Sequence, residues 1–432
     1  MNKVKDMKQV DEGMKELIWA EKNMPVLGAI KKRFEKEQPF KGKKVSVALH
    51  LEKKTGQLIR TLQAGGATVR VASCNPLTTD DRVAAALTTF DGIEVFAWAN
   101  QSTEEYYENL NTVLDSKPNL LIDDGADLIN IIHFKRAELI KHIIGASEET
   151  TTGIIRLKAM ANEGALKFPI LNANGAYSKH LFDNRYGTGQ SALNAIMTIT
   201  NNLIAGKNVV IVGYGWCGRG LAIRARGMGA RTIVVEAGDR MPYAEETEPS
   251  GWHKGLEALY EGFEVMNMDQ AAKIGDLFIT ATGDKHVIAV DHMKAMKDGA
   301  MLSNAGHFDL EIDIEGLEEM TKEVKEINPN CEEYILKNNN RIYLLSKGRL
   351  VNLARPAGQG HPLEIMDGSF AIQALALEFL AKNEGKLSNE VINIPPELDD
   401  YVARMALESH NIELQPLTDE QREYLTGFKE GT

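Results

Sequence analysis

Two carboxylates and three threonine hydroxyls stand side by side in residues 147–153, which read SEETTTG after the apolar run LIKHIIGA. Carboxylates and hydroxyls accept hydrogen bonds, and hydroxyls also donate them, so this stretch could hold a polar ligand. A helix N-cap at Ser147 or Thr150, ahead of the helical sequence TGIIRLKAMANEGAL, is the structural alternative. Capping uses one hydroxyl and leaves the other polar groups unexplained. We therefore expect a binding role in addition to a cap.

A second group of residues predicts a dinucleotide site. Gly213, Gly215 and Gly218 form a GxGxxG motif after the apolar run NVVIV, and the next apolar run ends in Glu236, 23 residues beyond Gly213. In such motifs the glycines make a tight turn, let the backbone approach a pyrophosphate and allow close helix–strand packing. Glu236 would accept hydrogen bonds from ribose hydroxyls and repel a 2′-phosphate, so NAD is favoured over NADP. A glycine-rich packing turn is the alternative.

These residues must be positioned by strands. Short apolar runs alternate with amphipathic segments of helix length; the runs are residues 44–50, 67–75, 93–100, 119–127, 168–174, 208–215, 231–238, 276–283 and 300–307. Such runs are typical of parallel sheets covered by helices on both faces. They fall into two groups around residue 190. The sequence therefore predicts an α/β fold with two doubly wound parallel-sheet domains.

Polar residues follow the strands of the first group. They are His50, Asn75, Asp123, Asp124, Ser147, Glu148, Glu149, Asn172 and Asn174. Ligands of open parallel sheets bind just beyond the carboxyl ends of the strands, so we expect these residues to line one crevice. Taken alone, Asp123 and Asp124 would be a solvated turn and His50 a core histidine.

Composition excludes several classes of partner. The chain has 432 residues, a net charge of −12 and no long basic stretch, which disfavours nucleic acid. No apolar run is long enough to cross a membrane. Cys74, Cys217 and Cys331 lie far apart and show no metal-ligand spacing, so no metal site is expected and a cytoplasmic location fits best.

Taken together, the motifs resemble the S-adenosyl-L-homocysteine hydrolase family. The matching stretches include DDGADLINIIH (123–133), GASEETTTGIIRLKAMANEGALKFPILNAN (145–174), KHLFDNRYG (179–187), GYGWCGRG (213–220), NAGHFDLEID (304–313), GRLVNL (348–353) and GHP (360–362). The resemblance runs from about residue 10 to the end. It implies reversible hydrolysis of S-adenosyl-L-homocysteine to adenosine and L-homocysteine through a transient 3′-ketone made by bound NAD.

The resemblance also implies roles for individual residues. Catalytic roles fall to His50, Asp124, Glu149, Lys179, Asp183, Asn184 and His292, and substrate contacts to Glu52, Lys54, Thr55, Asp124, Glu149, Lys179, Asp183 and His361. Cofactor contacts fall to Thr150, Thr151, Thr152, Asn184, Gly213, Gly215, Trp216, Cys217, Gly218, Arg219, Gly220, Glu236, Asn304, Gly306, His307, Asn352 and His361. Lys179 would act as a base with Asp183 at the 3′-hydroxyl, which needs a pKa lowered toward about 7–8 by burial.

Three of the departures from the family bear on the substrate, the cofactor or the subunit contacts. Glu52 and Lys54 stand where most members carry a threonine and a glutamate, and a lysine that only donates suits the 6-oxo group of hypoxanthine. S-inosyl-L-homocysteine is therefore an alternative substrate, unless Lys54 points to solvent and backbone reads the purine. Residues 237–255 form an added polar segment that could cover NAD. The C-terminus lacks the lysine- and tyrosine-containing tail that in many members reaches a neighbouring subunit.

The expected domains are a substrate-binding domain at 1–189 with a returning segment at 353–390, and an NAD-binding domain at 190–352. Residues 391–432 are expected to form a C-terminal dimerisation segment, in a homotetramer or dimer. Two other classes of protein share parts of this pattern. An ordinary NAD-dependent dehydrogenase would consume NAD, and a catalytically dead NAD-sensing protein would have lost Lys179, Asp183 or Asp124.

Overall fold

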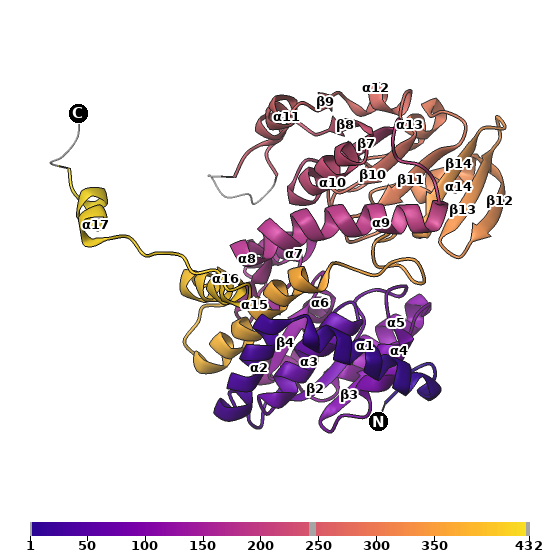
Figure 1. Ribbon diagram of the computed structural model, residues 1–432. Helices are drawn as coiled ribbons and strands as arrows, with labels where there is room; N and C mark the ends of the chain where they lie inside the picture. The colour runs from indigo at the N-terminus through magenta and orange to yellow at the C-terminus, as the bar shows by residue number, and fades with distance from the viewer. Residues whose placement is uncertain (1, 242–247, 429–432) are drawn as a thin grey trace.

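The computed structural model describes residues 2–241 and 248–428, which form two α/β units (Figure 1). Within these residues the first unit contains a seven-stranded sheet in which all pairs of strands are parallel. Its spatial order is β15 (Val391–Asn393), β6 (Ile170–Asn172), β5 (Gly145–Glu148), β4 (Leu120–Asp123), β1 (Lys44–Ala48), β2 (Thr68–Ala72) and β3 (Ile93–Phe96).

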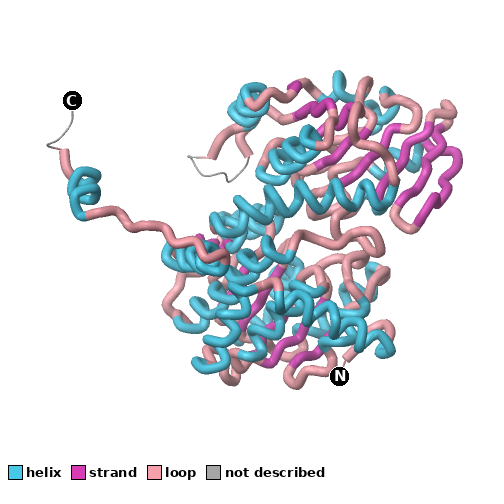
Figure 2. Tube along the Cα trace, viewed as in Figure 1, coloured by secondary structure: helices cyan, strands magenta, loops and turns pink. Residues whose placement is uncertain are grey.

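The second unit contains an eight-stranded sheet among the described residues, and this sheet is mixed. Its order is β12 (Thr321–Asn328), β13 (Cys331–Leu336), β14 (Arg341–Leu345), β11 (Ala300–Asn304), β10 (Leu277–Thr280), β7 (Asn208–Val212), β8 (Arg231–Val235) and β9 (Glu264–Val265). The strands from β14 to β9 pair in parallel, whereas β12, β13 and β14 form an antiparallel meander at one edge. This meander is visible at one end of the upper unit in Figure 2.

Helices cover both faces of each sheet. Around the first sheet lie α1 (Val10–Lys22), α2 (Pro25–Glu37), α3 (Lys53–Ala64), α4 (Asp81–Leu87), α5 (Thr103–Leu114), α6 (Asp127–Phe134), α7 (Thr151–Asn162), α15 (Leu363–Lys382) and α16 (Pro396–Ser409). Around the second lie α9 (Thr188–Thr200), α10 (Trp216–Gly227), α11 (Gly251–Tyr260), α12 (Met268–Ala272), α13 (Val290–Ala295) and α14 (Ile314–Met320). The predicted doubly wound fold class is confirmed.

Alternation along the strands explains why each sheet carries two cores. In β4, Leu120 and Ile122 join the core beneath α1–α4 and α15, whereas Leu121 joins the core beneath α5–α7. Successive side chains of a strand point to opposite faces, so a strand buried on both faces is a continuous apolar run. The second sheet has the same division between a core with α9 and α10 and a core with α12–α14.

Every expected apolar run contains a strand, but six strands were not anticipated. These are β5, β9, β12, β13, β14 and β15. β5 reads GASE, and its small and polar residues give no apolar signal although all four are buried. β12 reads TKEVKEIN and is largely exposed at the sheet edge. Tertiary pairing, rather than local hydrophobicity, makes these segments extended.

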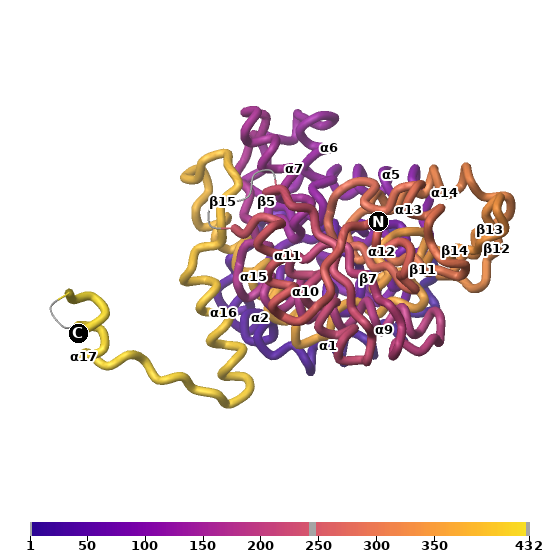
Figure 3. Tube along the Cα trace, turned by 90° about the horizontal axis from the view of Figure 1, so that it is seen from above, coloured from indigo at the N-terminus to yellow at the C-terminus, as the bar shows by residue number. Residues whose placement is uncertain are grey.

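The C-terminal segment expected at 391–432 is divided in the structure. β15 extends the first sheet, and α16 packs on α15 and α2. Beyond α16 the chain leaves the body as an extended arm that ends in α17 (Asp419–Thr426), as Figures 1 and 3 show. The arm exposes large apolar side chains, namely Ile412, Leu414, Leu417, Tyr424, Leu425 and Phe428. Among the described helices, none is both long and apolar enough to span a membrane.

Candidate active site

A cavity of about 1250 Å³ lies where the carboxyl ends of both sheets meet. From the first sheet it receives residues that follow β1, β4, β5 and β6, and from the second sheet residues that follow β7, β8, β10 and β11. The neighbours β1–β4 and β7–β10 are the points where the strand order reverses, which is where ligands of doubly wound sheets bind. The topology therefore brings the two predicted groups of residues to one place.

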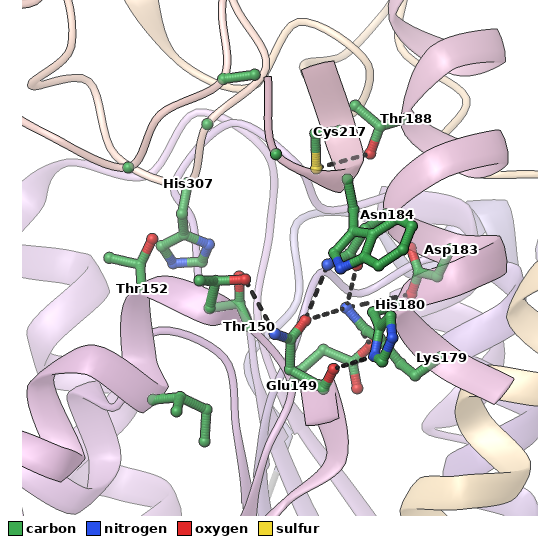
Figure 4. A pocket seen from close by; sticks show the side chains of 18 of the residues that line it. Glu149, Thr150, Thr152, Lys179, His180, Asp183, Asn184, Thr188, Cys217 and His307 are labelled. Carbon is green, nitrogen blue, oxygen red and sulfur yellow. Dashed lines mark hydrogen bonds and ion pairs between the residues drawn. The ribbon is translucent and has the colours of Figure 1, made fainter. Parts of the chain in front are cut away.

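Lys179 stands at the centre of the first cluster in this cavity (Figure 4). Its Nζ donates hydrogen bonds to Asn184 Oδ1 at 2.8 Å and Asn174 Oδ1 at 3.2 Å. The same Nζ lies 3.5 Å from Asp183 Oδ2 and 3.6 Å from Glu149 Oε1. These four side chains surround one buried ammonium, so a hydroxyl placed here would meet both a cation and carboxylates.

A short π-helix positions this cluster. The segment His180–Gly187 has π-helical geometry and directly follows Lys179 at the end of α8 (Tyr177–Lys179). π-helical turns are rare and are found mostly at functional sites. The wide turn presents Asp183 and Asn184 to Lys179 from one face of the chain. The local sequence KHLFDN supplies Lys179, Asp183 and Asn184, and the π-helical backbone brings these three side chains together.

The charge state of Lys179 differs from the expectation. Burial disfavours its ammonium, but Asp183 and Glu149 outweigh burial and raise the pKa of Lys179. The predicted lowering of the Lys179 pKa is therefore wrong for this structure. Burial raises the pKa of Glu149 to about 8, with Lys179 acting in the opposite direction. The pKa of Asp183 is lowered, because Lys179 and His361 outweigh its burial.

Helix α15 supplies two partners that sequence reasoning missed. Gln373 Nε2 donates to Glu149 Oε2 at 2.5 Å, and Ser369 Oγ donates to Asp183 Oδ2 at 2.8 Å. The other carboxylate oxygen of Asp183 is hydrogen-bonded to His361 Nδ1. Gln373 and Ser369 are fully buried and four residues apart, so they share one face of α15. The sequence does contain a signal for this pair, because Ser369 and Gln373 are two polar residues at helical spacing in the stretch SFAIQALAL.

Asp124 forms the second cluster, between two imidazoles. His50 Nε2 lies 3.4 Å from Asp124 Oδ2, and His307 Nδ1 lies 3.4 Å from Asp124 Oδ1. His50 Nδ1 is hydrogen-bonded to Thr78 Oγ1 at 2.9 Å. Burial lowers the pKa of His50 to about 4, although Asp124 opposes this shift. His50 is therefore a neutral imidazole at physiological pH.

His292 does not line this cavity. Its Nδ1 accepts a hydrogen bond from the Ala289 N–H at the start of α13, and its Nε2 lies 3.4 Å from the exposed Asp269. His292 thus caps a helix on the second unit. His307, expected near the cofactor, lines the cavity and faces Asp124. The sequence placed both His292 and His307 at the site, and only the path of the chain after β11 shows that His307 alone of the two lines the cavity.

Four of the polar residues expected at the first sheet edge also lie outside the cavity lining. Asn75 Oδ1 accepts from the Leu77 N–H in a turn, and Asp123 and Glu148 accept hydrogen bonds from backbone amides. Ser147 is buried within β5. The N-cap of α7 is Thr150, whose side chain makes no capping hydrogen bond. The hydroxyl cap considered for SEETTTG is therefore absent.

Glu52 and Lys54 line another wall of the cavity. Both are buried, and Lys54 Nζ lies 2.9 Å from Glu52 Oε2 and donates to the Gln359 carbonyl at 3.0 Å. Lys54 therefore does not point to solvent. Burial lowers its pKa, and Glu52 opposes the shift. Thr55 also lines the cavity, with its hydroxyl donating to the His50 carbonyl at 2.5 Å.

The glycine loop after β7 forms the opposite wall. Gly213 has a left-handed φ of +99°, and a Cβ at Gly215 would meet open space, so the loop presents bare backbone at the cavity. A Cβ at Gly218 would collide with the Gly213 carbonyl. Glu236 lines the cavity at the end of β8 and accepts a hydrogen bond from the Tyr214 N–H. This arrangement fits a dinucleotide, because the N-terminus of α10 faces a cavity with room for phosphates.

The remaining expected cofactor residues divide into two sets. Those that line the cavity are Thr150, Thr151, Thr152, Asn184, Trp216, Cys217, Arg219, Gly306, His307, Asn352 and His361. Asn304, Gly218 and Gly220 are not in the lining. Asn304 instead accepts from Gly306 N–H and donates to the carbonyls of Phe308 and Gly348, which fixes the loop after β11. A Cβ at Gly220 would collide with the Arg185 carbonyl, so this glycine permits close packing.

The added segment at 237–255 approaches the same wall. Met241, Glu248, Pro249 and Lys254 line the cavity near Glu236, and residues 242–247 lie outside the described residues. Two buried oxygens in the cavity, Glu149 Oε1 and Asn352 Oδ1, have no hydrogen-bond partner among the described residues. Buried acceptors are normally satisfied, so both fit a ligand that brings hydroxyl or amide donors.

Comparison with known proteins agrees with this geometry. Residues 1–138 match the family model for S-adenosyl-L-homocysteine hydrolase, and residues 184–358 match the model for its NAD binding domain. The chain is 54% identical over 432 residues to S-inosyl-L-homocysteine hydrolase of Methanococcus maripaludis, with 100% of both chains covered. It is 52% identical over 431 residues to adenosylhomocysteinase of Saccharolobus solfataricus, covering 100% of this chain and 99% of the other. The chain belongs to the S-adenosyl-L-homocysteine hydrolase family of NAD-using enzymes.

Proposed function

We propose that the protein catalyses the reversible hydrolysis of S-adenosyl-L-homocysteine to adenosine and L-homocysteine through a 3′-keto intermediate. One observation carries this proposal: a cavity that joins a dinucleotide loop to two separate proton-transfer clusters. A simple dehydrogenase needs one such cluster at the carbon it oxidises. A second acid/base beside the first fits a reaction that also removes a proton from a neighbouring carbon.

The bare backbone of Gly213 and Gly215, together with Glu236, would hold NAD. When bound, NAD supplies reversible oxidation of the 3′-hydroxyl, and it is regenerated within one turnover. Thr150, Thr151 and Thr152 lie at the seam between the two sheets and would donate to the cofactor. Asn184 holds Lys179 in place through the hydrogen bond from Nζ.

The first cluster handles the sugar hydroxyls. Glu149 Oε1, which lacks a hydrogen-bond partner among the described residues, would accept from the ribose diol. Lys179 and Asp183 would share the proton of the 3′-hydroxyl. Because the pKa of Lys179 is raised, its ammonium must first pass a proton to a neighbouring carboxylate before it can act as a base. Asn174 and Asn184 keep Nζ pointed at the sugar during this exchange.

The second cluster handles elimination and water addition. Asp124 would take the 4′ proton, which the 3′-ketone acidifies. His307, rather than His292, would donate a proton to the departing sulfur, because it lies beside Asp124. His50 is a neutral imidazole at physiological pH and can accept a proton from the attacking water. Closing the two units over this cavity would exclude bulk water.

Lys54 makes S-inosyl-L-homocysteine a second candidate substrate. An ammonium has three N–H donors, and two of them face Glu52 and Gln359, so one is left for an acceptor in the cavity. A 6-oxo group accepts a hydrogen bond, whereas a 6-amino group donates. Lys54→Glu should therefore shift kcat/KM toward the adenosyl compound by roughly tenfold, or ~1.4 kcal/mol. Lys53→Glu, at the neighbouring position that pairs with Glu16 and lies outside the cavity lining, is the matched control.

The decisive experiment measures thiol release from the adenosyl and inosyl compounds side by side, with NAD bound. Thiol without net reduction of NAD supports the hydrolase. No thiol from either compound would overturn the proposal, and net reduction of NAD would favour a dehydrogenase.

We also propose that the C-terminal arm joins subunits of a homo-oligomer in the cytoplasm. The arm carries exposed apolar side chains on a segment that leaves the body, which a second copy of the chain could cover. Removal of residues 412–432 should convert a dimer or tetramer to a smaller species in analytical ultracentrifugation. An unchanged sedimentation mass would contradict the proposal.

A further inference from the structure

Glu148 is a fully buried carboxylate that the proposed reaction does not use. It ends β5, next to Glu149, but its side chain turns away from the cavity toward the segment after β4. Oε1 accepts from the Gly125 N–H at 2.8 Å and from the Thr150 N–H at 3.1 Å. Oε2 accepts from the Ala126 N–H at 3.0 Å. One side chain thus ties the turn after Asp124 to the loop after Glu149.

The turn that Glu148 holds has an unfavourable backbone. Gly125 and Ala126 both have left-handed φ angles, +96° and +64°. For alanine this conformation costs roughly 1–2 kcal/mol, so other contacts must stabilise it. Consecutive amides in such a turn converge on one point and form a binding site for a carboxylate. Glu148 fills that site and thereby fixes the residues that directly follow Asp124.

Two glycines leave room for this contact. A Cβ at Gly153 would collide with the Glu148 carboxylate, and a Cβ at Gly125 would collide with the His307 imidazole. Gly153 lies within α7, where alanine would otherwise favour the helix by roughly 1 kcal/mol. Glycine at these positions lets Glu148 and His307 both approach the turn that carries Asp124.

Asp123 supports the same turn from the other side of Asp124 in the sequence. Its Oδ1 accepts from the Asp124 N–H at 3.1 Å and its Oδ2 from the Ile129 N–H at 2.9 Å. Its backbone carbonyl accepts from the Glu149 N–H at 3.0 Å. The turn is therefore fixed to β4 by Asp123, and to β5 by Glu148.

We propose that Glu148 is a positioning residue that sets Asp124 against the 4′ carbon while Glu149 holds the sugar. This inference rests on the proposed function. Oxidation at the 3′ carbon depends on the side chains of Lys179, Asp183 and Glu149, and the Glu148 carboxylate makes its hydrogen bonds to backbone amides instead. Two of its three hydrogen bonds go to the Asp124 turn, so its loss should impair removal of the 4′ proton more than oxidation.

Glu148→Gln tests this inference. The amide oxygen of the glutamine can still accept from the Gly125 and Thr150 N–H groups, as Oε1 does. Its NH₂ group would face the Ala126 N–H, so two hydrogen-bond donors would meet without an acceptor. We expect thiol release and exchange of the 4′ hydrogen with solvent to fall by about 10²-fold, as displacements of about 1 Å do. Reduction of bound NAD on adding the nucleoside, followed by near-ultraviolet absorbance, should fall less than threefold.

Asp367→Asn is the matched control. Asp367 is also buried and accepts from two backbone amides, Val26 N–H at 2.8 Å and Leu27 N–H at 2.7 Å, at the start of α2. Asp367→Asn places an NH₂ against a backbone N–H in the same way, at a residue outside the cavity lining. Stability should therefore fall, while the ratio of 4′ exchange to NAD reduction stays unchanged. Gly153→Ala is a second variant, which should lower that ratio although Glu148 remains.

The outcomes separate the two proposals. A wild-type protein that releases no thiol contradicts the proposed function, whatever the variants do. If the wild type is active and Glu148→Gln lowers 4′ exchange and NAD reduction by the same factor, or neither, the positioning role is wrong. A selective loss of 4′ exchange in Glu148→Gln and Gly153→Ala, absent from Asp367→Asn, supports it.

Discussion

The carboxyl edges of the two sheets meet one cavity but are built differently. The first sheet presents charged side chains in two clusters, in which Lys179 faces Glu149 and Asp183, and Asp124 faces His50 and His307. The second sheet presents bare backbone at Gly213 and Gly215. Proton transfer requires titratable groups, whereas a pyrophosphate requires amide donors and space. The first edge should therefore be sensitive to removal of side chains and the second to their addition.

At the edge of the first sheet, the two acids of each neighbouring pair, Asp123–Asp124 and Glu148–Glu149, have different roles. Asp124 and Glu149 face the cavity, while Asp123 and Glu148 face the backbone that carries them. Adjacent side chains of extended chain point to opposite sides, so a pair of acids at a strand end supplies one group for chemistry and one for support. The second edge has a similar support, since Glu311 accepts hydrogen bonds from the Thr282 and Gly283 amides.

Lys179→Met gives the largest expected effect on this comparison. It removes the ammonium that Asp183 and Glu149 share. Thiol release and reduction of bound NAD should both fall by about 10³-fold. The control is Lys167→Met, at an exposed position of the same unit. More than a tenth of the wild-type rate in Lys179→Met would contradict a proton-transfer role.

The lowered pKa of His50 predicts how the free energy of unfolding depends on pH. Its pKa is about 4 in the folded protein against 6.5 for the unperturbed group, so the unfolded chain binds more protons between these values. The contribution to the free energy of unfolding is full above pH 6.5 and is lost as pH falls toward 4, by about 3 kcal/mol. Urea unfolding of His50→Gln should show a flatter acid limb than the wild type. His410→Gln, on the protein surface, should keep the wild-type slope.

Gly215→Val tests the second edge and has the smallest expected effect. The added side chain would enter open space at the cavity, so the fold should persist while affinity for NAD falls by roughly tenfold, or ~1.4 kcal/mol. Titration calorimetry of the cofactor-free protein measures this affinity. Gly227→Val, at the other end of α10 and also in open space, should bind NAD as the wild type does. Equal affinity in both variants would contradict the assigned pyrophosphate wall.

Several elements of the fold and the site are readable from sequence. Continuous apolar runs predict the buried parallel strands, because a strand covered on both faces needs apolar residues at every position. The spacing of Gly213, Gly215 and Glu236 predicts the dinucleotide wall, since the motif lies within one strand–helix–strand unit. β5 could not be predicted in this way, because its sequence, GASE, has no apolar run and is extended through pairing with β4 and β6.

What the sequence determined by itself is local: strand positions, the glycine turn and the types of the reacting side chains. Tertiary structure decided which histidine faces Asp124, which acids face the cavity, and that Gln373 and Ser369 reach the sugar cluster from a returning helix. It also decided the direction in which the pKa of Lys179 moves. Burial and neighbouring charge act through space, and residues far apart in the sequence supply both.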